Sequence, residues 1–242
     1  MTYTVIARCQ DSGRIGLGIA TYSIAVGGYC PFFMGNEAVL STQAFANPAL
    51  GLLALESLGR NSAPSKVILD LAVSDPGFDY RQVGIINLSG DVGMHTGINC
   101  RTWAGHEVGE GFAVFGNVLK SGDVVSAMGE AYRNSDEGDL AERLLVTLEA
   151  GKRAGGQVNS EGLPLPEKSA ALIVKGNDII QNIDLRIDLH EDAVTELRRV
   201  YKTYVSYLEY YELRARHPQK TPAQDVWVKQ SLLEKKRKLS NN

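Results

Sequence analysis

The chain has 242 residues, enough for one large domain or two small ones, and it is 44% hydrophobic and 22% charged, as soluble globular proteins are. A formal net charge of -3 argues against a nucleic-acid surface, and no apolar run is long enough to span a bilayer. No signal-peptide pattern is present either, so we expect a cytoplasmic protein with no nucleic-acid and no membrane partner. The three cysteines, Cys9, Cys30 and Cys100, follow no zinc-site spacing, which predicts reduced thiols and no metal.

The first residues have the pattern of a β-hairpin. Two strand-like runs, 2–8 and 15–21, flank the turn residues Asp11-Ser12-Gly13. Thr2 directly follows Met1, and Met1 is usually removed when the next residue is small. Removal would give Thr2 a free α-amine, whose unperturbed pKa of about 7.7–8.0 leaves it partly neutral near pH 7.

A threonine hydroxyl beside its own neutral amine is a known activated nucleophile, because the amine accepts the proton without a separate histidine. No lysine precedes Lys66, so no lysine from the first strands can assist. We therefore predict Thr2 as the catalytic residue. If Met1 is retained, an amide replaces the amine and this chemistry is lost.

Apolar runs and turn signals predict the elements that follow. Asn47-Pro48 has the form of a helix start, with Asn as the cap and Pro at the first helical position. We expect residues 154–168 to form a connecting segment that could cover a cleft. The expected strands are 38–43, 82–88, 92–96, 111–119, 169–174 and 179–187, and the expected helices are 48–59, 64–73, 123–133 and 139–153.

Helices in consecutive pairs between groups of strands do not suit a parallel βαβ repeat. They favour antiparallel sheets stacked face to face with helix pairs outside. We therefore predict an α+β fold for residues 1–190, a four-layer αββα sandwich of two antiparallel sheets. Residues 191–242 are predicted to form a C-terminal helical extension with a charged, solvated tail at 234–238.

The C-terminal extension has the spacing of a helix seam that packs on another helix. Five tyrosines lie within 201–211, and they cannot all face one core. The stretch either packs on the chain's own domain or joins two copies, and we expect a homo-oligomer through residues 194–211. The seam consists of Val194, Leu197, Tyr201, Tyr204, Leu208 and Tyr211.

Three amide side chains are candidates for oxyanion or substrate binding. Gln43 and Asn47 lie between an expected strand and a helix N-terminus, where free backbone N–H groups gather. Asn47 either only caps the helix or also donates to a substrate, whereas no cap explains Gln43. Asn117 falls inside an apolar strand, which either a structural hydrogen bond or an oxyanion contact would explain.

The segment 95–106 is dense in reactive side chains. His95, Cys100 and His106 could in principle bind zinc, but their spacing matches no usual zinc pattern. We expect instead that His95, Thr96 and His106 pack as polar residues around the site.

Taken together, short stretches across residues 2–215 resemble the domain-of-unknown-function family 1028, which is grouped with N-terminal-nucleophile hydrolases. The resemblance implies the αββα fold and a nucleophile of the Thr2 type. One of the stretches contains Ser169, which we also place around the site. The matching stretches are Thr2–Arg8, Thr42–Pro48, Tyr80–Gly84, His95–Gly97, Trp103–His106, Gly116-Asn117, Ser169–Leu172 and Asp184–Arg186.

These observations predict an N-terminal-nucleophile amidohydrolase that cleaves a C–N bond of a small amide or ureido compound without a cofactor. Its partner would be a small-molecule substrate. The alternative is a non-catalytic binding or oligomeric scaffold protein on the same fold. A metal hydrolase that uses the His95 region is a third possibility.

Overall fold

The computed structural model describes residues 1–135 and 138–231, so the predicted charged tail at 234–238 lies outside the described residues. The contacts between Cα atoms divide the chain into two compact units. Unit 1 is Met1–Val200 and unit 2 is Tyr201–Asn242. None of the helices in the described part of the chain is long and apolar enough to cross a membrane.

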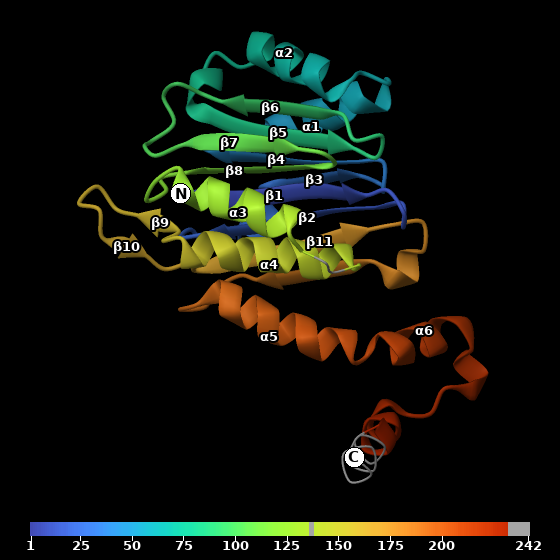
Figure 1. The fold of residues 1–242 in the computed structure, drawn as a ribbon. Helices are drawn as coiled ribbons and strands as arrows, with labels where there is room; N and C mark the ends of the chain where they lie inside the picture. The colour runs from blue at the N-terminus through green and yellow to red at the C-terminus, as the bar shows by residue number, and fades with distance from the viewer. Residues whose placement is uncertain (136–137, 232–242) are drawn as a thin grey trace. The chain divides into compact units, whose positions relative to one another are not determined.

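Unit 1 contains a six-stranded antiparallel sheet with β1 near its centre (Figure 1). The strand order is β12-β11-β2-β1-β8-β7, and β1 pairs with β2 through the predicted hairpin. The strands are β1 (Thr2–Cys9), β2 (Arg14–Thr21), β7 (Gly105–Gly109), β8 (Phe112–Asn117), β11 (Ser169–Lys175) and β12 (Ile183–Ile187).

A second antiparallel sheet has four strands in the order β3-β4-β5-β6. They are β3 (Pro31–Met34), β4 (Ala38–Ala44), β5 (Arg81–Asn87) and β6 (Val92–Thr96). The predicted pair of antiparallel sheets is therefore confirmed. Residues 154–168, expected as a connection, contain the short strands β9 (Gln157–Val158) and β10 (Pro164–Leu165), which pair with each other.

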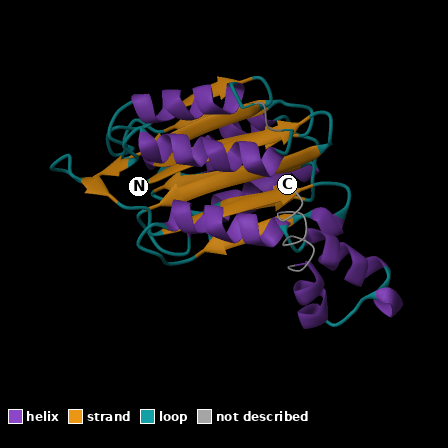
Figure 2. Ribbon diagram, turned by 60° about the horizontal axis from the view of Figure 1, so that its bottom comes forward, coloured by secondary structure: helices purple, strands orange, loops and turns teal. Residues whose placement is uncertain are grey.

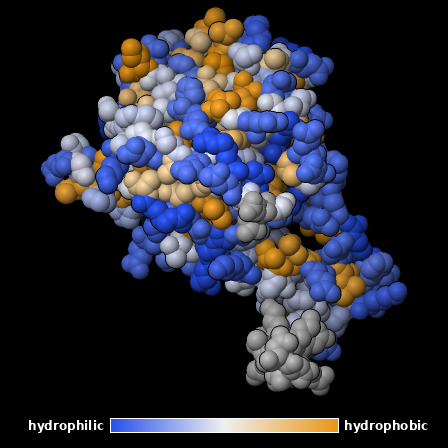
Figure 3. All heavy atoms as spheres, viewed as in Figure 1, coloured by the Kyte–Doolittle hydropathy of each residue, from blue (hydrophilic) through white to orange (hydrophobic). Residues whose placement is uncertain are grey.

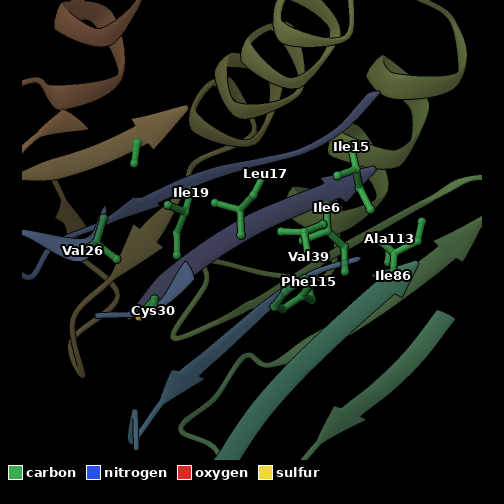
Figure 4. Packing of buried hydrophobic residues seen from close by; sticks show 11 residues of the cluster. Ile6, Ile15, Leu17, Ile19, Val26, Cys30, Val39, Ile86, Ala113 and Phe115 are labelled. Carbon is green, nitrogen blue, oxygen red and sulfur yellow. The ribbon is translucent and has the colours of Figure 1, made fainter. Parts of the chain in front are cut away.

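The two sheets of unit 1 face each other across an apolar core (Figure 4). Ile6 and Phe115 come from the six-stranded sheet and meet Val39 and Ile86 of the four-stranded sheet. Phe115 lies over Gly84 so closely that a Cβ there would be 2.7 Å from its ring. The missing side chain of Gly84 lets β5 and β8 approach each other.

Helices pack on the outer faces of the two sheets, as Figure 2 shows with helices in purple over strands in orange. α1 contacts β3 and β4, and α2 contacts β5 and β6, whereas α3 and α4 pack on the six-stranded sheet. Asn47 caps α1 as predicted, because its side chain accepts a hydrogen bond from the Ala49 N–H. The helices are α1 (Pro48–Gly59), α2 (Pro64–Ser74), α3 (Asp123–Arg133) and α4 (Leu140–Arg153), with short 3-10 turns at Val26–Gly28, Phe78–Tyr80 and Ile179–Gln181.

Some strands differ from the predictions. β3 and β7 are not among the predicted strands, because glycine, proline and charged residues weaken their sequence pattern. The expected strand at 179–187 begins only at Ile183, since Asp178 caps the 3-10 turn Ile179–Gln181 through the Ile180 N–H.

The outer surface of α1 and α2 carries several apolar side chains, and orange spheres gather over these helices at the top of Figure 3. In the same view, hydrophilic residues dominate the middle of the molecule, where α3 and α4 lie. The exposed apolar residues of α1 and α2 are Leu52, Leu53, Leu69 and Val73.

The predicted C-terminal seam is not one continuous helix. α5 (Ala193–Val205) begins in unit 1, where Arg198 forms ion pairs with Glu142 and Glu149 of α4. A turn at 206–207 then interrupts the helix, and the Ser206 hydroxyl donates to the Thr203 carbonyl there. α6 (Leu208–Arg216) follows, and a 3-10 turn at Pro218–Lys220 comes after it.

The aromatic residues of unit 2 pack on one another. The rings of Tyr207 and Tyr210 lie 5.7 and 5.1 Å from that of Trp227, and Tyr204 lies 5.8 Å from Tyr211. These contacts give the tyrosines partners within their own unit. The homo-oligomer through residues 194–211 stays a prediction.

Candidate active site

Four polar residues lie side by side across one end of the six-stranded sheet. Thr2 pairs with Thr21 of β2 on one side and with Asn117 of β8 on the other, and Thr21 pairs with Ser169 of β11. Directly opposed residues in antiparallel strands project to the same face, so the four side chains form one row. We call Ser169, Thr21, Thr2 and Asn117 the nucleophile row; all four are buried, with Thr2 only 6% exposed.

A second polar row lies on the facing sheet. Gln43 pairs with Gln82, and Gln82 pairs with Thr96, so these three form the facing row. The two rows meet where the Asn117 Nδ2 donates to the Gln82 Oε1 at 3.0 Å. The sheets thus bring together two predicted site residues, Gln43 and Asn117, that are far apart in the chain.

Gln82 is the centre of the resulting hydrogen-bond network. Its Oε1 also accepts from the Gln43 Nε2 at 2.9 Å. Its Nε2 lies 3.0 Å from the Thr96 hydroxyl, 3.1 Å from the Gly105 carbonyl and 2.9 Å from the Gly116 carbonyl. Gln82 therefore ties the facing row to β7 and β8 of the other sheet.

Gln43 makes structural hydrogen bonds at both ends of its amide. Its Oε1 accepts from the Thr4 hydroxyl at 2.6 Å and from the Ser41 hydroxyl at 3.2 Å, while its Nε2 donates to Gln82. Its side chain is completely buried. These bonds fix the Gln43 side chain between Thr4 of β1 and Gln82 of β5.

The Thr2 hydroxyl is held by its neighbour in the row. Its Oγ1 lies 3.2 Å from the Thr21 Oγ1. The single hydroxyl proton of Thr21 is given to the Met1 carbonyl, so the Thr2 hydroxyl is the donor in this pair. Thr21 thus orients the Thr2 oxygen.

The amine of Met1 lies in a poorly solvated position beside this row. Burial, which is the main cause, and the nearby Arg101 guanidinium together lower its pKa to about 6, against the opposing effects of Cys30 and Cys100. An amine with this pKa is mostly neutral at pH 7 and can accept a proton. The environment at this end of β1 therefore favours a neutral terminal amine.

Neither cysteine beside the amine is suited to act as the nucleophile. Burial raises the pKa of the Cys30 thiol to about 12 and also raises the pKa of Cys100. Both thiols stay protonated at neutral pH, and the thiolate is the reactive form. Neither thiol is therefore in its reactive form at neutral pH.

The backbone around the two rows has unusual conformations. Val118, directly after Asn117, has φ of 57°, and Ala44, directly after Gln43, has φ of 72°. Ala25, in the loop that follows Thr21, has φ of 55°. Positive φ is unfavourable for residues with a side chain, above all for a β-branched valine, and such conformations concentrate at functional sites.

The remaining predicted site residues lie at different distances from the rows. His106 Nδ1 is 2.9 Å from the Thr96 hydroxyl, and burial, helped by His95, lowers the His106 pKa, so the ring is neutral at pH 7. His95 bonds to the Phe78 carbonyl at 3.0 Å and stacks on the Phe78 ring. The Asn47 side-chain oxygen is used in the α1 cap.

Ser169, at the end of the nucleophile row, holds the loop after β2. Its hydroxyl donates to the Ser23 carbonyl at 2.8 Å and accepts from the Val26 N–H at 3.1 Å. The loop that follows Thr21 is therefore fixed from β11. In the described parts of the chain, no three His, Cys, Asp or Glu side chains are grouped so that they could hold a metal ion.

Thr21 and Gln82 are absent from the predicted site. Thr21 could have been found from the hairpin, because a turn at Asp11-Ser12 pairs residues whose numbers add to 23, and Thr21 is then opposite Thr2. Gln82 carries no such signal, since its role depends on how the two sheets face each other.

Comparison with known proteins gave one family model, described as a family of unknown function (DUF1028), which matches residues 2–197. A crystal structure of a DUF1028-family protein from Silicibacter pomeroyi is similar, with 28% identity and a TM-score of 0.76. The match covers 84% of this chain and 86% of that one. No curated protein matches.

Two structures of Anbu are more distant matches. Anbu (ancestral beta-subunit) from Yersinia bercovieri has 13% identity and a TM-score of 0.38, over 85% of this chain and 96% of that one. Anbu from Hyphomicrobium has 11% identity and a TM-score of 0.37, over 85% and 95%. Scores of this size do not establish a shared fold.

Proposed function

The chain belongs to the family of unknown function DUF1028, and from that premise and the geometry around Thr2 we propose that it is an N-terminal-nucleophile hydrolase. Its reaction is the hydrolysis of a C–N bond in a small amide or ureido compound. We further infer that the two facing sheets and their outer helices form the four-layer αββα sandwich of such enzymes. The similarity to the family structure at a TM-score of 0.76 supports a common fold within the family.

One observation carries the proposal. The Thr2 Oγ1 lies 3.2 Å from the Thr21 Oγ1 in a buried row, and the Met1 amine beside it lies where burial and Arg101 favour the neutral form. Removal of Met1 would place that amine on Thr2 itself. The nucleophile and the proton acceptor would then belong to one residue.

The proposed reaction has two stages. The Thr2 Oγ attacks the carbonyl carbon while the Thr2 amine accepts the hydroxyl proton. The amine returns this proton to the leaving nitrogen as the C–N bond breaks, which leaves an ester on Thr2. Water then attacks the ester carbonyl and gives its proton to the amine. The ester C–O bond breaks, and the amine returns the proton to the Thr2 oxygen.

Asn117 has a specific role in this proposal. Its Oδ1 is buried and accepts no hydrogen bond from the described residues, although its Nδ2 is held by Gln82. A buried acceptor without a donor is unfavourable, and an N–H of the freed Thr2 amine would satisfy it. The second Nδ2 hydrogen of Asn117 is the proposed donor to the oxyanion.

The test is to free Thr2 and measure turnover. The chain is produced behind a removable fusion whose protease cuts directly before Thr2, and it is assayed on a panel of small amides and ureido compounds. We expect turnover only after cleavage. The matched control leaves one glycine in front of Thr2 after cleavage and should stay inactive. Equal turnover by the glycine-extended chain would reject the role of the Thr2 amine.

The pH dependence of turnover should report the Thr2 amine. The amine must be neutral to accept the proton, so activity should rise with pH through its pKa. Arg101 lowers the pKa of the Met1 amine, and we expect the same cation to lower the pKa of the Thr2 amine once Met1 is removed, so replacing Arg101 should raise that pKa. We therefore expect Arg101→Gln to move the rising limb of the kcat profile to higher pH. Arg60→Gln, an exposed change at the C-terminal cap of α1, should leave the limb in place.

A further inference from the structure

Arg101 lies beside the nucleophile row, in the loop 97–104 between β6 and β7. Its carbonyl accepts a hydrogen bond from the Val118 N–H at 3.1 Å. Val118 directly follows Asn117, whose backbone pairs with that of Thr2 in the sheet. The backbone of Arg101 is therefore held close to the start of β1.

The side chain of Arg101 lies against an aromatic ring at the same end of the sheets. Its guanidinium carbon is 5.3 Å from the centre of the Phe45 ring. Phe45 directly follows β4, two residues after Gln43, and meets the Tyr80 ring edge to face at 5.5 Å. Phe45 and Tyr80 are partly exposed, at 40% and 46%. A cation and an apolar surface are thus adjacent to each other and to the two polar rows.

Arg101 has no carboxylate partner in the part of the chain that the structure describes. Arg81, at the start of β5, differs because it forms an ion pair with Asp75 at 2.8 Å. The carbonyl of Asp79 bonds to the loop of Arg101, but its carboxylate pairs with no described residue. Among the causes of the lowered pKa of the Met1 amine, Arg101 is the only side chain that is charged at neutral pH. An uncompensated positive charge therefore lies beside this amine.

We propose that Arg101 binds a carboxylate group of the substrate, while Phe45 packs on an apolar part of it. The guanidinium fork can donate two parallel hydrogen bonds to the two carboxylate oxygens, and the aromatic ring offers apolar contact. The substrate class is then an N-acylated apolar amino acid, which carries its carboxylate close to the amide nitrogen. This assignment rests on the proposed hydrolysis at Thr2 and names the substrate of that site.

The test measures binding to the Thr2→Ala chain after removal of Met1, so that turnover does not interfere. The probes for titration calorimetry are N-acetylphenylalanine and its neutral counterpart, N-acetylphenylalanine amide. We expect the carboxylate probe to bind more tightly by about fivefold or more. Arg101→Gln should abolish this preference, and Arg101→Lys, which keeps the charge but loses the fork, should retain part of it. Arg60→Gln, the exposed change at the end of α1, is the control and should leave the preference intact.

The apolar contact is tested by changing the probe and the protein together. N-acetylglycine keeps the carboxylate and the amide but lacks the ring, so it should bind more weakly than N-acetylphenylalanine. This loss should be smaller in Phe45→Ala, because the ring then has less to contact. Equal binding of the two acids by the Thr2→Ala chain would overturn the assignment of Phe45.

The outcomes separate this proposal from the hydrolysis on which it rests. Absence of saturable binding of N-acetylphenylalanine, or an unchanged charge preference in Arg101→Gln, would overturn the role of Arg101 even where Thr2-dependent turnover is found. A preference that Arg101→Gln abolishes, in a protein that shows no Thr2-dependent turnover, would support the carboxylate site and reject the hydrolysis.

Discussion

Replacement of Thr2 by alanine is expected to lower turnover roughly 10⁴-fold or more, because it removes the attacking oxygen itself. The buried row that surrounds Thr2 should persist, since alanine fits wherever threonine does and loses only the bond to Thr21. Thr2→Ser keeps the hydroxyl and the amine and should retain substantial activity. The measurement is kcat/KM for the three chains on the best amide of the panel.

The three chains form a matched set. Threonine, alanine and serine are all small, so the same removal of Met1 is expected for each, and intact mass spectrometry verifies it. Differences in turnover then report the side chain alone. An alanine variant with undiminished kcat/KM would mean that another group attacks the substrate.

Replacement of Gln82 by methionine should have the largest effect on stability. Methionine has a similar length but can neither donate nor accept the bonds that Gln82 makes. Each buried group left unpaired costs about 1–3 kcal/mol, and a group that keeps another partner costs less, so we expect the free energy of unfolding to fall by about 3–5 kcal/mol. The groups that each lose one hydrogen bond are the side-chain amides of Gln43 and Asn117, the Thr96 hydroxyl, and the carbonyls of Gly105 and Gly116, and Thr96 keeps its bond to His106.

Urea denaturation of the Thr2→Ala chain, with and without Gln82→Met, measures this loss in a background without turnover. Gln219→Met, an exposed change in the short 3-10 turn of unit 2, is the control and should alter stability little. A loss below about 1 kcal/mol for Gln82→Met would show that the network is not needed to hold the sheets together.

The sequence predicts most of unit 1 because its signals are local. β1 and β2 flank clear turn residues, and Asn47-Pro48 starts α1 as expected. β3 and β7 are harder to predict, because pairing with a neighbouring strand, more than their own composition, makes them strands. The break between α5 and α6 has no local sequence signal either, since the heptad-like spacing continues across it.

The candidate site is predicted only in part, because some of its residues depend on how the two sheets face each other. Thr2 and Asn117 have sequence signals of their own, and the sheet register places them side by side. Gln43 and Thr96 were expected near the site, but only the facing of the two sheets joins them through Gln82. His95 and Asn47 serve neighbouring structure, through the Phe78 stack and the α1 cap.

The position of the covalent intermediate tests most directly whether Thr2 is the nucleophile. The chain freed at Thr2 is treated with a β-lactone, which acylates activated hydroxyl groups, and is then digested with trypsin. We expect one acyl group, carried by the peptide Thr2–Arg8 and located on the Thr2 oxygen, and no such adduct in the glycine-extended chain. Acylation of Cys9, Cys30 or Cys100 instead, or equal labelling of the extended chain, would contradict it.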